Sequence, residues 1–429
     1  MLQVFRLLIF VVFMFFSSVV VFLSDSAGGP IKEFFDPHRK VITVSPKDNL
    51  AKTVSSARPG TTILLKNGIY KVSSTLVFRW SDVWIRSESG DRNRVILDGK
   101  KPGKRLARDN CVNEIFAVLA PNVCIANLTA RYARDHIIHI FPLRGNPIKN
   151  VRMHNIHVYD SGQQLIKVNS SGSTPLYWVD NCILENSLLE FKDNSIMQKT
   201  GNSFYTGGLD VHGGMNWQIR DNTFRNIQRK GKLMEHAVHM WSKSRGTIVE
   251  RNRFINCYRA IGFGMKTRAD GLVRRYSDQK GDKPYFDHIG GMIRNNVIFN
   301  KKSIHLESGI ELMNVIDVEV LNNTVVSHNR PFASIEYRWP NTRVVIQNNI
   351  VSHNIRARDN ARAKLKCNIS SARRNLFRDY GKGDLHLSPN GKGAIDKGIP
   401  SAWGKVTVDI DGDRRDQQPD IGADELDHR

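Results

Sequence analysis

Three short segments carry polar side chains that could transfer protons, at matching positions within an alternating apolar pattern. They are 166–169 (Ile-Lys-Val-Asn), 209–212 (Leu-Asp-Val-His) and 238–241 (Val-His-Met-Trp). Such alternation is typical of β-strands, in which successive side chains point to opposite faces. Aligned by their apolar residues, the segments form two outward columns: Lys167, Asp210 and His239, then Asn169, His212 and Trp241. With neighbouring strands about 4.8 Å apart, the charged and polar members of both columns would face one patch of solvent.

The patch suits chemistry on an acidic sugar. Removal of the proton next to a uronate carboxylate builds negative charge on that carboxylate, which Lys167 or Asn169 could stabilise. His212 and His239 are candidate general bases, because histidine titrates near neutral pH. A lyase and an epimerase would share this first step.

Residues near the patch complete the candidate site. Asp210 could orient a histidine or hold a cation, and Tyr205 and His236 could donate or return a proton. The side chain of Trp241 offers a flat apolar face for a sugar ring. The catalytic candidates are therefore Lys167, Tyr205, Asp210, His212 and His239. The substrate-binding candidates are Asn169, His236, Trp241, Arg259, Glu311, Glu336 and Arg338.

The strands that follow would carry glycines and then glutamates in these columns. Gly262 and Gly264 predict a shallow floor without side chains, on which a polymer could approach the backbone. Glu311 and Glu336 would supply the two carboxylates that a glycoside hydrolase needs. Alternatively, they would form an exposed ion network with nearby arginines, which would contribute little to stability.

A repeat along the chain predicts the elements that position these residues. A short apolar stretch ending in Asn recurs nine times, at Asn127, Asn155, Asn186, Asn222, Asn252, Asn296, Asn323, Asn349 and Asn368. Repeats of this length indicate a solenoid, in which each unit stacks on the next. The unit has the period-two apolar spacing of a strand. Asn tolerates the left-handed corner of a coil, and stacked Asn amides can bond to one another in a ladder.

Four regions are expected along the chain. Residues 1–26 read as a secretory signal peptide or an uncleaved membrane anchor, because a basic residue precedes a long apolar run. Residues 27–40 are a linker, residues 41–383 form the solenoid, and residues 384–429 cap its end. We therefore expect a secreted, periplasmic or cell-surface protein that contacts a membrane only through an uncleaved N-terminal segment.

The chain is strongly basic, with 63 Lys and Arg against 41 Asp and Glu and a formal net charge of +22. A field of this sign attracts polyanions. For an exported protein the expected polyanion is an acidic polysaccharide and not nucleic acid. The five cysteines show no metal-ligand spacing. We expect no metal ligands and no required cofactor, with Ca²⁺ left open, and a monomeric protein.

Motifs at both ends of the repeat resemble those of a known superfamily. The opening 59–70 (Pro-Gly-Thr-Thr-Ile-Leu-Leu-Lys-Asn-Gly-Ile-Tyr), the Asn repeat and the closing 419–425 (Pro-Asp-Ile-Gly-Ala-Asp-Glu) are similar to right-handed parallel β-helix proteins of the pectate-lyase-like superfamily. The resemblance covers most of residues 41–425. It implies an all-β fold, a single-stranded right-handed parallel β-helix with N-terminal and C-terminal caps. It leaves the reaction open, because the superfamily includes lyases, hydrolases, epimerases and phage tailspikes.

The segment 205–212 (Tyr-Thr-Gly-Gly-Leu-Asp-Val-His) loosely resembles the Tyr…Asp-Pro-His motif of alginate C5-epimerases. This resemblance implies catalytic roles for Tyr205, Asp210 and His212, with His239 contributed by the next coil. The chain departs from the motif, since Val211 replaces Pro and a histidine stands where an acid is usual. Lyases of this fold with a Ca²⁺ site carry clustered acids, and no Glu-x-Glu cluster is found at the matching coil.

Three functions follow from the sequence. The leading one is an exported lyase or C5-epimerase acting on a uronate-containing polysaccharide through the patch around Lys167 and His239. The first alternative is a glycoside hydrolase of the same fold that uses Glu311 and Glu336. The second is a non-catalytic surface protein whose basic loops bind a polyanion.

Overall fold

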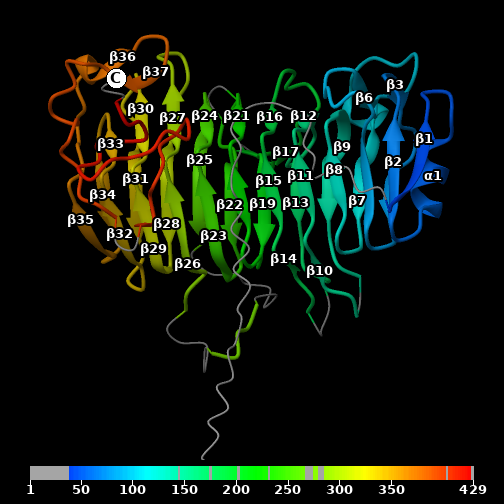
Figure 1. Ribbon diagram of the computed structural model, residues 1–429, viewed down its shortest axis with the longest axis horizontal. Coiled ribbons are helices and arrows are strands. Elements are labelled where there is room, and N and C mark those ends of the chain that lie inside the picture. Colours follow the sequence, from blue (N-terminus) through cyan, green and yellow to red (C-terminus); the bar gives the residue numbers. More distant parts are fainter. Residues whose placement is uncertain are drawn as a thin grey trace, which may run out of the picture. The chain divides into compact units, whose positions relative to one another are not determined.

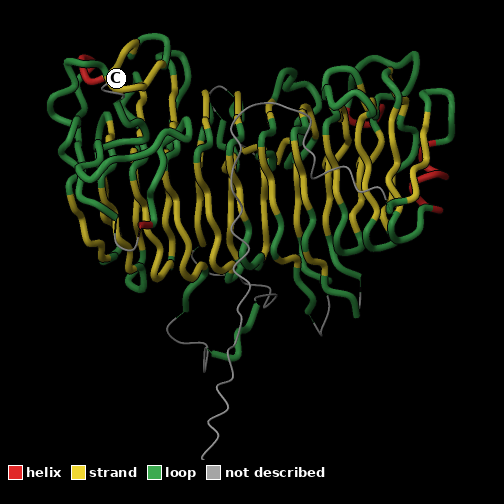
Figure 2. The backbone as a smooth tube through the Cα atoms, in the orientation of Figure 1, coloured by secondary structure: helices red, strands yellow, loops and turns green. Residues whose placement is uncertain are grey.

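Parallel strands stack along the chain into three sheets, and the backbone passes through each sheet in turn as it coils (Figures 1 and 2). The first sheet contains β1 (Lys40–Val44), β2 (Thr61–Leu65), β5 (Val83–Ser87), β8 (Cys124–Ala126), β11 (Arg152–His154), β15 (Ile183–Glu185), β20 (Gln218–Arg220), β23 (Ser244–Glu250), β26 (His288–Arg294), β29 (Val315–Leu321), β32 (Arg343–Gln347) and β35 (Arg362–Lys366). The second contains β3 (Gly68–Lys71), β6 (Val95–Asp98), β9 (Thr129–Ile140), β12 (His157–Ser161), β16 (Leu188–Glu190), β21 (Thr223–Arg225), β24 (Arg253–Ile255), β27 (Val297–Asn300), β30 (Thr324–Ser327) and β33 (Ile350–Val351).

The third sheet carries the predicted site. It contains β4 (Leu76–Phe78), β7 (Val112–Val118), the second half of the long strand β9, β13 (Ile166–Val168), β19 (Leu209–His212), β22 (His236–Trp241), β25 (Arg259–Gly264), β28 (Ser308–Met313), β31 (Ala333–Arg338) and β34 (Ile355–Arg358). Outside the three sheets lie α1 (Leu50–Ser56), the short 3₁₀ turns η2 (Arg108–Asn110) and η3 (Arg374–Leu376), β10 (Ile148–Lys149), β14 (Val179–Asp180), β17 (Lys199–Thr200), β18 (Ser203–Phe204), β36 (Phe377–Asp379) and β37 (Asp384–Leu387).

The structure is a computed structural model that describes residues 38–143, 145–172, 176–200, 203–229, 232–265, 274–278, 285–401 and 404–426. The chain divides into two units, residues 1–35 and 36–429, and every described residue belongs to the second. The predicted signal or anchor segment and most of the predicted linker therefore lie outside the described residues. Within the described ranges, no helix is long and apolar enough to cross a membrane.

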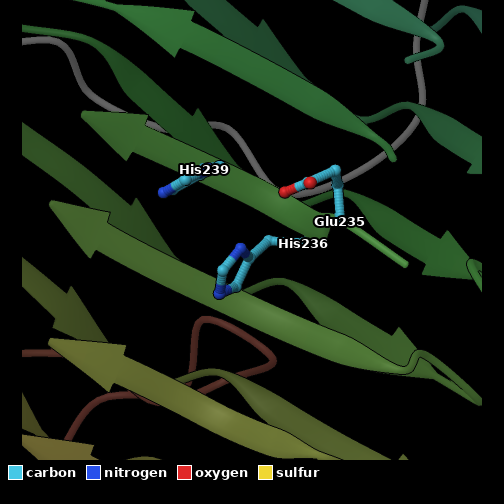
Figure 3. Close-up of side chains that lie close together, drawn as sticks. All are labelled: Glu235, His236 and His239. Atoms are coloured by element: carbon cyan, nitrogen blue, oxygen red, sulfur yellow. The ribbon is translucent and has the colours of Figure 1, made fainter. Parts of the chain in front are cut away.

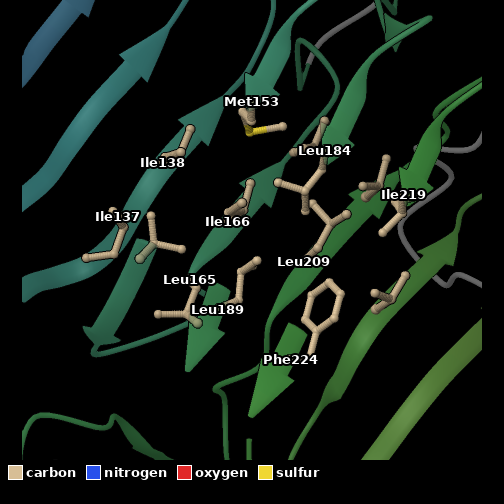
Figure 4. Packing of buried hydrophobic residues seen from close by; sticks show 14 of the residues in the cluster. Ile137, Ile138, Met153, Leu165, Ile166, Leu184, Leu189, Leu209, Ile219 and Phe224 are labelled. Carbon is tan, nitrogen blue, oxygen red and sulfur yellow. The ribbon is translucent and has the colours of Figure 1, made fainter. Parts of the chain in front are cut away.

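Apolar side chains fill the interior of the coils in columns. Ile138, Ile166 and Leu209 are register partners on β9, β13 and β19, and all three are fully buried (Figure 4). Each such side chain contributes roughly 1.5–3 kcal/mol on burial, so the columns are the main source of stability. The predicted all-β, parallel β-helix fold is confirmed, whereas the right hand of the coil and the end caps stay predictions.

The Asn ladder exists in the second half of the solenoid. The side-chain Nδ2 of each member donates to Oδ1 of the next at 2.9 or 3.0 Å, and the series is Asn222, Asn252, Asn296, Asn323, Asn349 and Asn368. The members from Asn222 to Asn349 are almost completely buried. The ladder therefore satisfies polar groups inside the turn that would otherwise be costly to bury.

The earlier repeats use Asn differently. Asn127, Asn155 and Asn186 have φ values of 55°, 48° and 53°, so they form the left-handed corner itself. In the later repeats that corner belongs to the preceding residue, such as Asn295 with φ 53° before Asn296. The repeated Asn therefore occupies two different positions in the coil, which are one residue apart. The sequence pattern alone does not distinguish these two positions.

The C-terminal segment packs against the outer side of the last coils. Leu385 and Leu387 join a second apolar cluster with Phe299, Val326 and Ile350, which belong to β27, β30 and β33. In Figure 1 this segment, coloured orange to red, lies beside those strands. The apolar face it covers is an outer face of the second sheet, while the edge strand β35 stays largely exposed.

The ladder makes a prediction about stability. Replacement of Asn323 by Ala would remove the side-chain acceptor of the Asn296 main-chain N–H and one acceptor of the Asn296 side-chain amide. It would also remove the amide that donates to the Ile293 carbonyl inside the turn. We expect the free energy of unfolding to fall by about 3 kcal/mol in urea denaturation, because an unsatisfied buried polar group costs about 1–3 kcal/mol. Asn93→Ala, at an exposed turn, is the control, and an equal loss in both variants would contradict the ladder's role.

Candidate functional site

The predicted alignment of the third sheet is confirmed strand by strand. Lys167 is the register partner of Asp210, and Asp210 is the partner of His239. The column continues through Gly262 to Glu311 and then to Glu336, and the second column pairs His212 with Trp241. The parallel ladder therefore brings residues from six successive strands, β13, β19, β22, β25, β28 and β31, onto one surface.

The expectation that the patch faces open solvent is wrong. Lys167, Asp210, His212 and His239 are only 4%, 6%, 7% and 6% exposed. They point outward from the sheet, but they cover one another through ion pairs and ring contacts. Tyr205, in the loop before β19, is 38% exposed and is the member of the group that reaches solvent.

The Lys167 ammonium is the centre of this group. Its Nζ lies 2.5 Å from Asp210 Oδ2, 2.9 Å from His212 Nε2 and 3.2 Å from Tyr205 Oη. An ammonium has three N–H donors, so these three acceptors saturate it. The His212 Nε2 lone pair is therefore already engaged by Lys167.

Lys167 and Asp210 form a buried ion pair. Burial alone would lower the pKa of Lys167, but the adjacent Asp210 carboxylate outweighs it and raises that pKa. Burial would likewise raise the pKa of Asp210, but the Lys167 charge holds it well below its usual range. Both groups are thus charged near neutral pH, and each compensates the desolvation of the other.

Trp241 joins the ion pair to the neighbouring histidine. Its indole Nε1 donates to Asp210 Oδ1 at 2.6 Å. The ring of His239 stacks on it at an interplanar angle of 7°, and His212 meets it edge-on. Part of the flat face expected to hold a sugar is therefore covered by His239.

His239 and His236 lie side by side, and burial lowers the pKa of both rings. The pKa of His239 is lowered to about 4. His239 Nε2 donates to the Gly264 carbonyl at 3.1 Å, and His236 Nε2 lies 2.9 Å from Glu311 Oε2. Although burial raises the pKa of Glu311, its hydrogen bond with His236 lowers that pKa to about 2.

The predicted open floor at Gly262 is also wrong. A Cβ built on Gly262 would lie 2.6 Å from His236 Nε2, because the His236 ring crosses this position to reach Glu311. Gly264 has φ +75°, and a Cβ there would lie 2.0 Å from the Met313 carbonyl oxygen. The two glycines make room for the histidine and for close coil packing.

Some of the remaining candidate side chains have partners in the structure and others do not. Glu336 pairs with Arg358 at 2.7 Å, and Arg338 pairs with Asp359, so the expected exposed network with Arg338 does not form. Among the described residues nothing forms an ion pair with Arg259, whose Nε is buried without a hydrogen-bond partner. The side-chain carbonyl of Asn169 likewise lacks a partner there.

Two groups of side chains in the described ranges could hold a metal ion. One is Glu235, His236 and His239, which lie close together in Figure 3. The other contains His386, whose two ring nitrogens both contact carboxylates; these contacts, chiefly that with Asp411, raise its pKa to about 9. That second group is an ion-pair network around a protonated imidazole. Both groups contain histidine, whereas Ca²⁺ prefers oxygen ligands.

Sequence analysis missed Glu235 and the closeness of the two histidines. Strict alternation places His236 and His239 on opposite faces, yet their ring centroids are 4.5 Å apart. The cause is a break in alternation, because Ala237 and Val238 both belong to the apolar core. The same pair of core residues recurs at Ile137 and Ile138, which is a signal that the sequence did contain.

The contact over Gly262 makes a prediction. The backbone conformation at Gly262 is open to any residue, so Gly262→Ala tests only whether there is room for a side chain. The added methyl group would displace the His236 ring from Glu311. We expect a loss of about 1–3 kcal/mol in the free energy of unfolding, as is typical of overpacking. Gly393→Ala, where a Cβ meets no atom within 4 Å, is the matched control, and an unchanged stability at Gly262 would refute the close contact.

Comparisons with known proteins agree with the architecture. The pectate lyase Pel9A superposes with a TM-score of 0.55 at 15% identity, covering 91% of this chain and 97% of that one. An alginate lyase from Paenibacillus sp. str. FPU-7 gives a TM-score of 0.40 at 11% identity, covering 78% and 99%. The A-module of the Azotobacter vinelandii mannuronan C-5 epimerase AlgE6 gives 0.35 at 12% identity, covering 75% and 93%.

No protein-family profile matches the sequence, and no curated protein matches it. At such low identities a structural likeness concerns the fold, and the two TM-scores below 0.5 add nothing to it. The chain therefore has the parallel β-helix fold of pectate lyase Pel9A.

Proposed function

We propose that the protein is an enzyme that acts on a uronate-containing polysaccharide by moving the proton next to the carboxylate, as a lyase or a C5-epimerase. The observation that carries this proposal is the buried Lys167 ammonium, whose three acceptors include one exposed group, the phenol of Tyr205. A proton carrier fixed beside a buried positive charge is what such a reaction needs.

Tyr205 is the proposed proton carrier. Its Oη accepts a hydrogen bond from Lys167 at 3.2 Å, so its own hydrogen is directed elsewhere and can be exchanged with a substrate. The ammonium stabilises negative charge that develops on the phenol oxygen during the transfer. Asp210 holds the ammonium in place.

The histidines fit positioning roles better than the base roles expected from sequence. The Nε2 lone pair of His212 accepts from Lys167, and the Nε2 hydrogen of His239 is donated to Gly264. Both side chains are nearly buried. We assign His212 to holding Lys167, and His239 to holding Trp241 and through it Asp210.

Arg259 and Asn169 are the proposed substrate-binding groups. Arg259 has no ion-pair partner in the described part of the chain and lies on β25 as the register partner of His236. A guanidinium without a partner is suited to bind a uronate carboxylate through two parallel hydrogen bonds. The unpartnered Asn169 carbonyl can accept from a sugar hydroxyl. The net charge of +22 would draw an anionic polymer toward both.

A hydrolase is the second candidate. Glu311 and Glu336 are register partners; the pKa of Glu311 is lowered to about 2, while that of Glu336 is raised, chiefly by burial. Carboxyl pairs with separated pKa values are typical of glycosidases. However, the two side chains are 8% and 2% exposed and hydrogen-bond His236 and Arg358. They therefore lack the access to solvent that Tyr205 has.

The apolar run within residues 1–26 supports export, so we place the enzyme in the periplasm, at the cell surface or outside the cell. Its substrate would be an acidic glycan of that compartment. Pectate, named for the similar lyase, and alginate are the first polymers to test.

The test is turnover of a polyuronate panel by the purified full chain. Ultraviolet absorbance of unsaturated uronate reports a lyase, and proton spectra of the product report an epimerase. We expect Tyr205→Phe to lower kcat/KM by about 10²–10⁴-fold, the usual contribution of a positioned acid or base. Tyr258→Phe is the matched control, because Tyr258 also lies beside the third sheet and hydrogen-bonds Glu307 instead.

Three outcomes would contradict this assignment. Full activity in Tyr205→Phe would remove Tyr205 from the reaction. Release of reducing ends without unsaturated or epimerised product, and its loss in Glu311→Gln, would indicate the hydrolase. Salt-sensitive binding to a polyanion without turnover of any polymer would indicate a binding protein.

A further inference from the structure

Glu235, His236 and His239 form a compact group at the start of β22. One candidate ligand atom from each residue lies within 4.8 Å of the other two. Figure 3 shows the three side chains close together. Two histidines and one carboxylate are a donor set that binds Zn²⁺ and other divalent transition metals.

The hydrogen bonds of the two histidines fix which ring nitrogen is available. A neutral His236 that donates its Nε2 hydrogen to the Glu311 carboxylate keeps the lone pair on Nδ1. Gly264 contributes a carbonyl oxygen, so His239 Nε2 also carries the hydrogen. In both imidazoles the Nδ1 lone pair is therefore left for another partner.

The Nδ1 atom of His236 has no such partner. The residue is only 3% exposed, and its Nδ1 is buried without a hydrogen bond to any described residue. An unsatisfied buried lone pair costs free energy comparable to a lost hydrogen bond. The cost is removed if a cation binds there.

The surroundings match those of known metal-binding histidines. Such a histidine usually donates its second ring nitrogen to a carboxylate or a carbonyl, which fixes its orientation and increases its basicity. Glu311 and the Gly264 carbonyl provide one partner of each kind. Within the described ranges, no hydrogen bond or ion pair occupies the carboxylate of Glu235.

The three candidate donor atoms would need to move only slightly closer together to bind one ion. Donor atoms bound to one zinc ion at about 2.1 Å lie about 3.4 Å apart in tetrahedral geometry. The present separations are at most 4.8 Å. Glu235 is partly exposed, so its side chain has room to rotate toward the two buried histidines.

We propose that Glu235, His236 and His239 bind one divalent transition-metal ion, with Zn²⁺ preferred over Ca²⁺. Three protein ligands leave a coordination position open, as in catalytic rather than purely structural zinc sites. The site adjoins the Lys167 group, because His239 stacks on Trp241, which bonds Asp210. The proposal stands without the proposed reaction, because metal binding is measured in the absence of turnover.

The experiment titrates the full chain, freed of metal with a chelator, with ZnCl₂ in a calorimeter and with CoCl₂ in an absorption spectrometer. We expect one equivalent of Zn²⁺, the visible bands of tetrahedral Co²⁺, and no comparable binding of CaCl₂. Glu235→Gln, which keeps the side-chain shape, should weaken Zn²⁺ binding by at least about tenfold. Glu311→Gln should weaken Zn²⁺ binding by about 10–100-fold, the usual effect of removing a residue that hydrogen-bonds a metal ligand.

Two control variants separate this site from others. Glu307→Gln removes the same charge from a glutamate that hydrogen-bonds Tyr258 and should leave binding unchanged. His386→Gln removes the histidine of the other candidate group and should also leave it unchanged. Circular dichroism melting confirms that each variant is folded. Absence of Zn²⁺ binding, or binding that survives Glu235→Gln but is lost in His386→Gln, would overturn the proposal.

Discussion

Main-chain hydrogen bonds between successive coils hold each residue beside its counterpart in the next coil, about 4.8 Å away. At that separation an uncompensated charge would repel or attract its neighbours strongly, because most of these positions are shielded from water. Arg152, Glu185 and Arg220 show the consequence on the first sheet. The central carboxylate lies 2.6 and 2.7 Å from the two guanidinium groups. Burial would raise its pKa, but hydrogen bonds and charges from His154 and the two arginines lower it to about 2.

The column of Lys167 obeys the same constraint with different residues. Its ammonium is neutralised by Asp210 in the next coil, and Glu311 further along is satisfied by His236 reaching across Gly262. A column that neutralises itself can be buried, and its ammonium then reaches an exposed group only through the phenol of Tyr205. A ligand would therefore contact residues at the edge of this column, namely the loop residue Tyr205 and the partly exposed Arg259.

The repeat and the register could be predicted from sequence because both follow from local apolar spacing. That spacing correctly paired Lys167 with Asp210 and Asp210 with His239. It could not predict burial, which depends on how rings from different coils pack, as His239 does on Trp241. Nor could it place His236, since the two adjacent core residues before His239 break the alternation on which the alignment relied.

The group around Lys167 and the proposed metal site lie on the same sheet and are joined by side-chain contacts. Trp241 donates to Asp210 on one side and stacks with His239 on the other, so the indole fixes the carboxylate and the imidazole together. Lys167 and His239 are separated by two strand spacings, about 10 Å, and the strand of Asp210 lies between them. A small molecule bound at one centre would not contact the other. An extended polymer lying across the strands could contact both, and in that case it would also pass Tyr205, in the loop before β19, and Arg259, the first residue of β25.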